Sequence, residues 1–153
     1  MNNKIIIAID AMGGENSPGK NIEGIFIFLK KNKNRDYFFN LYGDEKLINI
    51  ELNKHKISKE FYKIFHSSTI VSDEDTPLTA IKNSKDSSMW NSINSQIELD
   101  SNITLSAGNT AVLFVVSRML LKTIESVSKP ALAGLWPSKK KKYECCFRPW
   151  CQC

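Results

Sequence analysis

The pattern of apolar and polar positions divides the chain into alternating short and long segments. Residues 4–9 form a continuous, mostly β-branched run, which predicts a strand buried on both faces. Residues 18–31 repeat apolar side chains at spacings of three and four, which predicts a helix with Pro18 in its first turn. Further strands are predicted at residues 37–42, 61–66, 103–105 and from 129 to 135, and further helices at residues 45–54 and 111–122.

The middle of the chain is more polar. Residues 72–75 are expected to form an acidic loop, followed by a long helix with Thr76 as N-cap and Pro77 at its first position. This helix would carry on one face the apolar residues Leu78, Ile81, Met89 and Ile93. The regular alternation of strands and helices predicts an α/β fold, a layered and mostly parallel sheet flanked by helices.

Composition adds little to this picture. Of 153 residues, 42% are hydrophobic and 24% are charged, as in ordinary soluble globular proteins. No apolar run reaches the ~18 residues of a membrane span, and the N-terminus lacks the order of a signal peptide, so a cytoplasmic protein is expected. Most of the net charge of +5 lies in residues 138–153, which carry five basic side chains and one acidic one. The nearly neutral remainder predicts no nucleic-acid partner.

The end of the chain has an unusual composition, because all four cysteines lie within residues 145–153, after a run of lysines. Their spacing differs from the paired C-x2-C of a zinc site, and neither a metal site nor a disulfide framework is expected. Read one base later from Lys142 with A/T-rich codons, the tail becomes Asn-Met-Asn-Val-Val-Leu-Asp-Leu-Gly-Ala-Asn-Val, a buried strand ending in an acid and a glycine. Our hypothesis is that a frameshift near residue 142 makes residues 139–153 an aberrant tail. Residues 1–138 would then be the N-terminal part of a longer α/β domain.

Two segments at predicted strand ends carry candidate chemistry. Residues 10–14 are Asp-Ala-Met-Gly-Gly, and residues 106–110 are Ser-Ala-Gly-Asn-Thr. Glycines let backbone N–H groups approach an anion closely, and a following helix adds the positive end of its dipole. The structural alternative is a tight turn at the first segment and capping of the next helix by Asn109 or Thr110 at the second. The residues by themselves leave both interpretations open.

A third segment, Lys-Asp-Ser-Ser-Met at residues 85–89, completes a resemblance. In this order and spacing, the three segments resemble the N-terminal portion of the PlsX family, the phosphate acyltransferases of bacterial phospholipid synthesis. The resemblance covers about residues 4–137 and includes segments 43–44 and 129–132, and the frame-shifted tail is similar to the family's next motif. It implies a fold similar to that of phosphate acetyltransferases and isocitrate-type dehydrogenases.

The resemblance also implies an activity and partners. Members of the family are homodimeric enzymes that convert acyl-[acyl carrier protein] and inorganic phosphate into acyl phosphate and free carrier protein. A membrane acyltransferase then transfers the acyl group to glycerol 3-phosphate, so the intact protein would be cytoplasmic and peripheral to the membrane. Phosphate can attack the thioester directly, and a thiolate with a pKa near ~8.5 leaves readily, so no covalent nucleophile, cofactor or metal is expected.

On this basis, roles can be assigned to individual residues. Asp10 is expected to orient donors, because as a direct ligand it would repel phosphate. Lys85 is either a catalytic cation or a solvated surface lysine. The predicted catalytic residues are Asp10, Lys85 and Asn109. The residues predicted to bind phosphate or the acyl group are Gly13, Gly14, Ser87, Ser88, Ser106, Gly108 and Thr110.

The chain also departs from the family's pattern. Trp90 stands where a basic residue is usual, Ala111 where a glycine is usual, and residues 91–102 are more polar than expected. Two other functions therefore stay open. One is a phosphate- or nucleotide-binding module without catalysis, and the other is a gene remnant without function.

Overall fold

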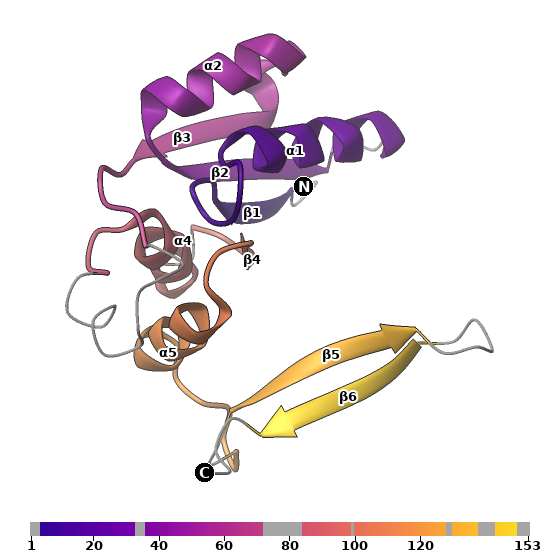
Figure 1. Cartoon of the computed structure of the whole chain (residues 1–153), viewed down its shortest axis with the longest axis vertical. Helices are drawn as coiled ribbons and strands as arrows, with labels where there is room; N and C mark the ends of the chain where they lie inside the picture. Colours follow the sequence, from indigo (N-terminus) through magenta and orange to yellow (C-terminus); the bar gives the residue numbers. More distant parts are fainter. Residues whose placement is uncertain are drawn as a thin grey trace. The chain divides into compact units, whose positions relative to one another are not determined.

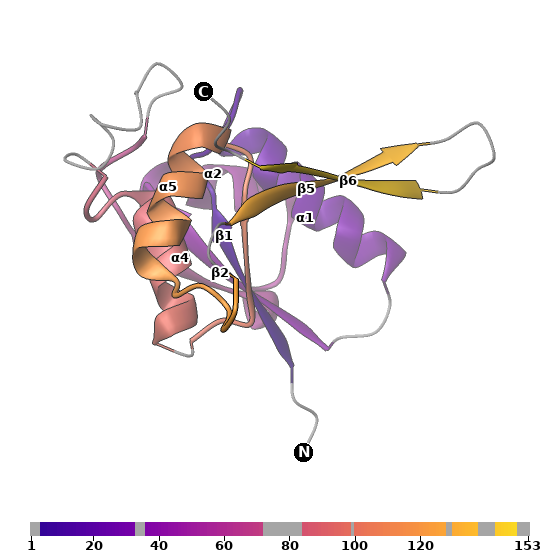
Figure 2. The same cartoon turned by 90° about the horizontal axis from the view of Figure 1, so that it is seen from below.

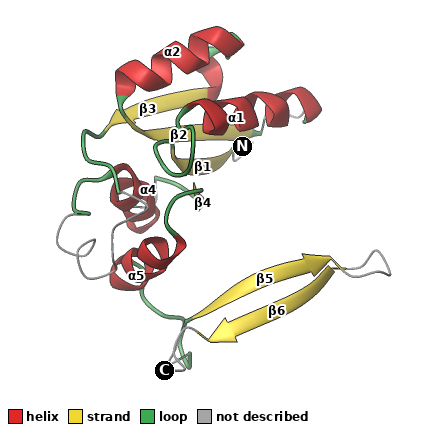
Figure 3. Cartoon of the chain, viewed as in Figure 1, coloured by secondary structure: helices red, strands yellow, loops and turns green. Residues whose placement is uncertain are grey.

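The computed structural model describes residues 4–32, 36–71, 84–98, 100–127, 130–137 and 143–149. The chain forms two units, Met1–Leu121 and Lys122–Cys153. In the first unit, strands and helices alternate around one sheet (Figure 1, Figure 3). The second unit contains an antiparallel pair of strands, β5 (Ala131–Pro137) and β6 (Tyr143–Pro149).

The sheet of the first unit is parallel, with strand order β3-β2-β1-β4. Its strands are β1 (Ile5–Asp10), β2 (Tyr37–Gly43), β3 (Tyr62–His66) and β4 (Ile103–Ser106). This confirms the predicted α/β class. The register places Asp10 beside Tyr42 of β2 and Ser106 of β4, so three strands end at the same edge of the sheet.

Helices cover both faces of this sheet (Figure 1, Figure 2). One face is covered by α1 (Gly19–Lys31) and α2 (Glu45–His55), and the other by α4 (Ser88–Ile97). The helix α5 (Thr110–Leu120) packs against α4 through a small apolar cluster. That cluster contains Met89, Ile93, Val112 and Val116.

The main apolar core lies between the sheet and the α1–α2 pair. Alternate strand residues such as Ile9 and Leu41 meet Ile22 of α1 and Ile48 of α2, and all four are buried. This arrangement follows from the two periodicities in the sequence, because side chains of period 2 on a strand meet side chains of period 3.6 on a helix. The core holds the strands in register and so fixes the edge at which they end.

The predicted long helix starting at Thr76 is wrong in one respect. Its beginning at residues 72–83 lies outside the described residues, but residues 84–87 form a turn, and α4 begins only at Ser88. Asp86 has a left-handed φ of 65°, and the Ser87 hydroxyl accepts a hydrogen bond from Trp90 N–H as an N-cap. Both features start a new helix here rather than continue one. Met89 and Ile93 are buried on α4, as predicted.

The other predicted elements of the first unit are confirmed, with ends that shift by one or two residues. The strand predicted at 61–66 is preceded by a short 3-10 helix, η1 (Lys59–Phe61), and the strand predicted from residue 129 is observed as β5. The boundary at residue 138 and the out-of-frame origin of the tail stay predictions. Among the helices that the structure describes, none combines the length and the apolar character needed to cross a bilayer.

Candidate active site

The buried carboxylate of Asp10 joins the three segments singled out in the sequence. Asp10 ends β1 and is 2% exposed. Its Oδ1 accepts a hydrogen bond of 2.6 Å from the Ser88 hydroxyl at the start of α4. Its Oδ2 accepts one of 2.7 Å from the Ser106 hydroxyl at the end of β4. Segments that lie 78 and 96 residues apart in the chain therefore meet at a single side chain.

The loops after β1 and β4 pack against each other through glycines. A Cβ on Gly13 would lie 2.6 Å from Asp10 Oδ2 and 2.8 Å from the backbone nitrogen of Gly108. A Cβ on Gly108 would lie 3.0 Å from Met89 Cε and 3.3 Å from Gly13 Cα. Glycine is required at position 13 because the backbone of the second loop lies too close for any side chain, whereas at position 108 a Cβ would need small shifts of its neighbours.

The loop after β1 is also held from α1. The Asn21 amide donates to the backbone oxygens of Ala11 at 2.9 Å and Gly13 at 3.0 Å. Sequence reasoning missed this residue. A signal for it was present, since Asn21 lies four residues before Ile25, on the apolar side of α1. A polar side chain on a buried stripe needs hydrogen-bond partners, and the loop backbone supplies them here.

Several backbone donors predicted to bind phosphate have partners within the protein. Gly13 N–H donates to the Asp10 backbone oxygen at 3.4 Å, and Gly108 N–H donates to Ser106 Oγ at 3.1 Å. Asn109 is the N-cap of α5, with Oδ1 accepting hydrogen bonds from the N–H groups of Ala111 and Val112. The capping interpretation thus holds for the Asn109 side chain.

The remaining predicted residues lie around this centre. Ser87 is fully buried and caps α4, whereas Lys85 is exposed in the preceding turn. Thr110 is exposed at the first position of α5, and Gly14 is half-buried with a φ of +89°. The structure therefore brings Asp10, Gly13, Ser88, Ser106 and Gly108 into direct contact and packs Gly14 against the second loop, whereas Lys85 and Thr110 lie exposed at the periphery.

The hydrogen bonds to Asp10 also limit what the Ser88 and Ser106 hydroxyls can do. A hydroxyl has one proton, and those of Ser88 and Ser106 are both directed at Asp10. In this arrangement neither serine can donate to an anion as well. Their visible effect is to hold the Asp10 carboxylate, and Ser106 in turn accepts from Gly108 of the second loop.

The same face of α4 continues this polar contact along the sheet. Ser92 and Ser95 are buried, the Ser92 backbone oxygen accepts from the Thr104 hydroxyl at 2.8 Å, and the Ser95 and Ser101 hydroxyls lie 2.7 Å apart. Burial beneath this helix raises the pKa of the Tyr42 hydroxyl above its ordinary value of 10.0. The unexpected polarity of residues 91–102 therefore has a structural use, since the Ser95 side chain bonds to Tyr42 of β2 and the Asn102 side chain accepts from Ile6 N–H of β1.

Comparison with known proteins identifies the relatives of this chain. The family model described as "Fatty acid synthesis protein" matches residues 5–146. Over 140 residues, the chain is 44% identical to a phosphate acyltransferase of Pelagibacter ubique (strain HTCC1062), covering 92% of this chain and 41% of the relative. Phosphate acyltransferases of Rhodopseudomonas palustris (strain TIE-1) and Wolbachia pipientis subsp. Culex pipiens (strain wPip) are each 36% identical, with 92% and 94% of this chain covered.

The matched region covers most of this chain but less than half of each relative. The chain spans 39% of the Rhodopseudomonas protein and 42% of the Wolbachia protein. Within that part, the three segments of the family resemblance are the ones that the structure assembles around Asp10. The chain belongs to the PlsX family of fatty acid synthesis proteins.

Proposed function

We propose that this chain carries a phosphate acyltransferase site that acts on acyl-[acyl carrier protein] and inorganic phosphate. The observation that carries the proposal is the hydrogen-bonded assembly of the three family segments on Asp10. A phosphate oxygen forms a bond to the thioester carbonyl carbon while the carbon–sulfur bond breaks. The products are acyl phosphate and the carrier's thiolate, which takes up the proton released from phosphate.

The geometry supports a positioning role for Asp10. Its carboxylate is buried and each of its oxygens accepts one hydroxyl, so it sets the separation of the loops at residues 13–14 and 106–110. The exposed Thr110 lies at the N-terminus of an 11-residue helix, where the helix dipole favours an anion. Lys85, exposed before α4, supplies a positive charge on the chain segment that bonds to Asp10. We propose that phosphate binds on the solvent-exposed side of these loops, near Thr110 and Lys85.

This reaction does not require a nucleophile from the protein. Orienting phosphate against the thioester supplies the main catalytic effect, and the departing thiolate needs little help because its pKa is near ~8.5. Our proposal extends to the partners expected of the family. These are acyl carrier protein, a second copy of the intact protein, and a membrane acyltransferase that uses glycerol 3-phosphate.

The test measures acyl phosphate formed from acyl-[acyl carrier protein] and phosphate, trapped with hydroxylamine. We expect product with the 153-residue chain and a loss of about ten-fold or more in the rate with Asp10→Asn, because hydrogen bonds to a charged group contribute about 1.5–3 kcal/mol. Asp36→Asn is the matched control, since Asp36 is exposed just before β2, at the edge of the sheet where β1 begins rather than where it ends. Absence of acyl phosphate from a folded chain, or an equal loss in both variants, contradicts the proposal.

A second function is phosphate binding without catalysis. It is favoured by the exposed Thr110 at the N-terminus of α5, because a helix N-terminus favours an anion whether or not a thioester is bound. Calorimetric titration with phosphate distinguishes the two functions. Binding by a folded chain that forms no acyl phosphate supports the binding module.

A further inference from the structure

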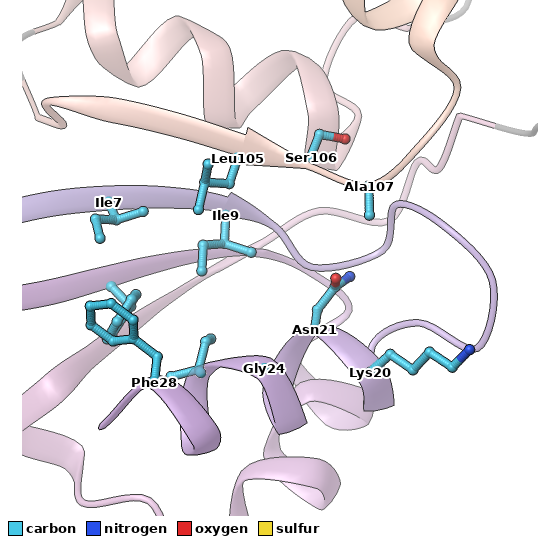
Figure 4. Close-up of a pocket in the computed structure, with 11 residues that line it drawn as sticks. Ile7, Ile9, Lys20, Asn21, Gly24, Phe28, Leu105, Ser106 and Ala107 are labelled. Atoms are coloured by element: carbon cyan, nitrogen blue, oxygen red, sulfur yellow. The ribbon is translucent and has the colours of Figure 1, made fainter. Parts of the chain in front are cut away.

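A cavity of about 370 Å³ lies between α1 and the sheet. Most of its lining is hydrocarbon, from β1, β2, β4 and the inner side of α1 (Figure 4). The apolar residues that line it include Ile7, Ile9, Ile25, Phe28, Phe39 and Leu105. A volume in the range of ~300–1,000 Å³ is typical of small-molecule sites, and these walls would exclude a charged or strongly polar ligand.

One end of the cavity reaches the candidate active site. Ser106 and Ala107 line it at the end of β4, and Lys20 and Asn21 line it at the start of α1. Figure 4 shows the Ala107 side chain pointing toward α1, whereas the Ser106 side chain points to the opposite side. That opposite side holds the Asp10 carboxylate, to which Ser106 donates its hydroxyl proton. The apolar space and the family's polar cluster therefore share one strand end.

We propose that this cavity holds the fatty acyl chain, with the reacting carbonyl end at Ser106 and Ala107 and the hydrocarbon tail beneath α1. The inference rests on the proposed function for the identity of the ligand. The cavity matches a chain with one polar end, since its polar lining residues lie together and the rest is apolar. The positive charge of Lys20 at that end complements the negative charge of an acyl phosphate.

Gly24 is the residue through which the size of the cavity can be changed. It lines the cavity from α1, and a Cβ built on it meets no atom within 4 Å. A glycine inside a helix normally costs about 0.5–1 kcal/mol relative to alanine. Here the missing side chain leaves open space along the wall, and a larger side chain at this position would occupy part of the volume proposed for the acyl tail.

The first test uses the unchanged 153-residue chain and a series of alkylphosphonates from methyl to dodecyl, with binding measured by calorimetry. We expect affinity to rise about four-fold for each added methylene until the cavity is filled, because that is the usual gain on burying such a group. Beyond that length the affinity should level off. A series with no dependence on chain length, measured on folded protein, overturns the proposal.

The second test compares Gly24→Leu with Gly24→Ala as the matched control. We expect Gly24→Leu to weaken dodecylphosphonate binding at least ten-fold and to leave methylphosphonate binding unchanged. Gly24→Ala should bind both ligands as the unchanged chain does. If Gly24→Leu does not fold, the chain-length series still decides the question.

The two proposals fail in different ways. Chain-length-dependent binding without acyl phosphate formation supports the acyl cavity and counts against catalysis by this chain. Acyl phosphate formation at equal rates from acetyl and dodecanoyl thioesters, with a flat binding series, supports the proposed function and overturns the acyl cavity.

Discussion

The two faces of the parallel sheet are held by different kinds of contact. On the α1–α2 face, hydrocarbon meets hydrocarbon, as where Leu41 packs with Ile22. On the α4 face, hydroxyl groups join the helix to the sheet, as where Ser88 of α4 donates to Asp10 and Thr104 of β4 donates to the Ser92 backbone oxygen. The first face gains its stability from buried apolar area, whereas the second depends on every polar group keeping its partner.

This difference separates stability from positioning. Apolar contacts are non-directional, so the α1–α2 face can hold the sheet together without specifying where one atom lies. Hydrogen bonds are directional, and those on the α4 face fix the carboxylate that joins the family's three segments. The contrast between the faces can be tested by removing one side chain at a time from each.

The largest effect is expected on the apolar face. Leu41 is fully buried, and Leu41→Ala should lower the free energy of unfolding by about 2–5 kcal/mol, because it removes hydrocarbon and leaves a cavity. Urea denaturation followed by circular dichroism measures this change. Ile50→Ala is the control, since Ile50 is 52% exposed on α2 and should change stability by less than about 0.5 kcal/mol. Similar losses in the two variants would show that the apolar face is not a packed core.

A smaller but still large effect is expected at the polar centre. Ser88→Ala leaves one oxygen of the buried Asp10 carboxylate without its donor, which should cost about 1.5–3 kcal/mol. The same substitution at the exposed Ser68 serves as control in the same urea experiment. If Ser88→Ala and Ser68→Ala are equally stable, the hydrogen bond to Asp10 does not contribute to the fold.

Substitutions at Ser95 and Ser101 test whether the cost of removing a hydroxyl on the α4 face comes mainly from leaving its partner without a hydrogen bond. Ser95→Ala should cost about 0.5–1.5 kcal/mol, because it removes a 2.7 Å contact between two buried hydroxyls. Adding Ser101→Ala should then cost less than the sum of the single changes, since the second hydroxyl no longer has a partner to lose. Strict additivity in the double variant would mean that the two hydroxyls act independently.

The smallest effect is a dependence on pH. Burial raises the pKa of Tyr42, and the negative charges of Asp100 and Glu98 add to this, while a hydrogen bond with Ser95 lowers it. The folded chain therefore keeps this proton more tightly than the unfolded chain. The stability that the protonated Tyr42 hydroxyl contributes is fully present below its pKa in the unfolded chain. It is lost as the pH rises through its higher pKa in the folded chain.

We therefore expect the unfolding free energy of the unchanged chain to fall more steeply between about pH 9 and about pH 11 than that of Tyr42→Phe. Parallel urea titrations of the two proteins provide the comparison, because all other titrating groups are common to both. Equal slopes would show that the Tyr42 hydroxyl titrates normally in the folded state.

The sequence was most informative about the apolar face. Residues such as Ile22 and Ile25 recur at helical spacing beside unbroken apolar strands, and this periodicity is a direct consequence of burial. The start of α4 was harder to place. Ser87 as a cap and Ser92 as a buried helix residue are the same amino acid, and only the tertiary contact distinguishes them.

The candidate site was predictable only where a local sequence pattern marks it. The acid and the glycines after β1 stand out because a buried strand ends there, and the family resemblance added the other two segments. The pairing of Asp10 with Ser88 and Ser106 depends on the strand order β2-β1-β4 and on the placement of α4. Local patterns do not encode strand order, so these bonds and the contact of Asn21 with the loop could not be derived from the sequence.

The close approach at Gly13 has a consequence for how this site can change during evolution. The methyl group of an alanine at this position would collide with Asp10 Oδ2 at 2.6 Å and with the backbone nitrogen of Gly108 at 2.8 Å. A substitution at Asp10 could relieve the first collision but not the second, because the second involves the backbone of the other loop. Glycine should therefore be retained at position 13 while other positions change. In relatives that have lost it, Asp10 and Ser106 are expected to have been replaced as well.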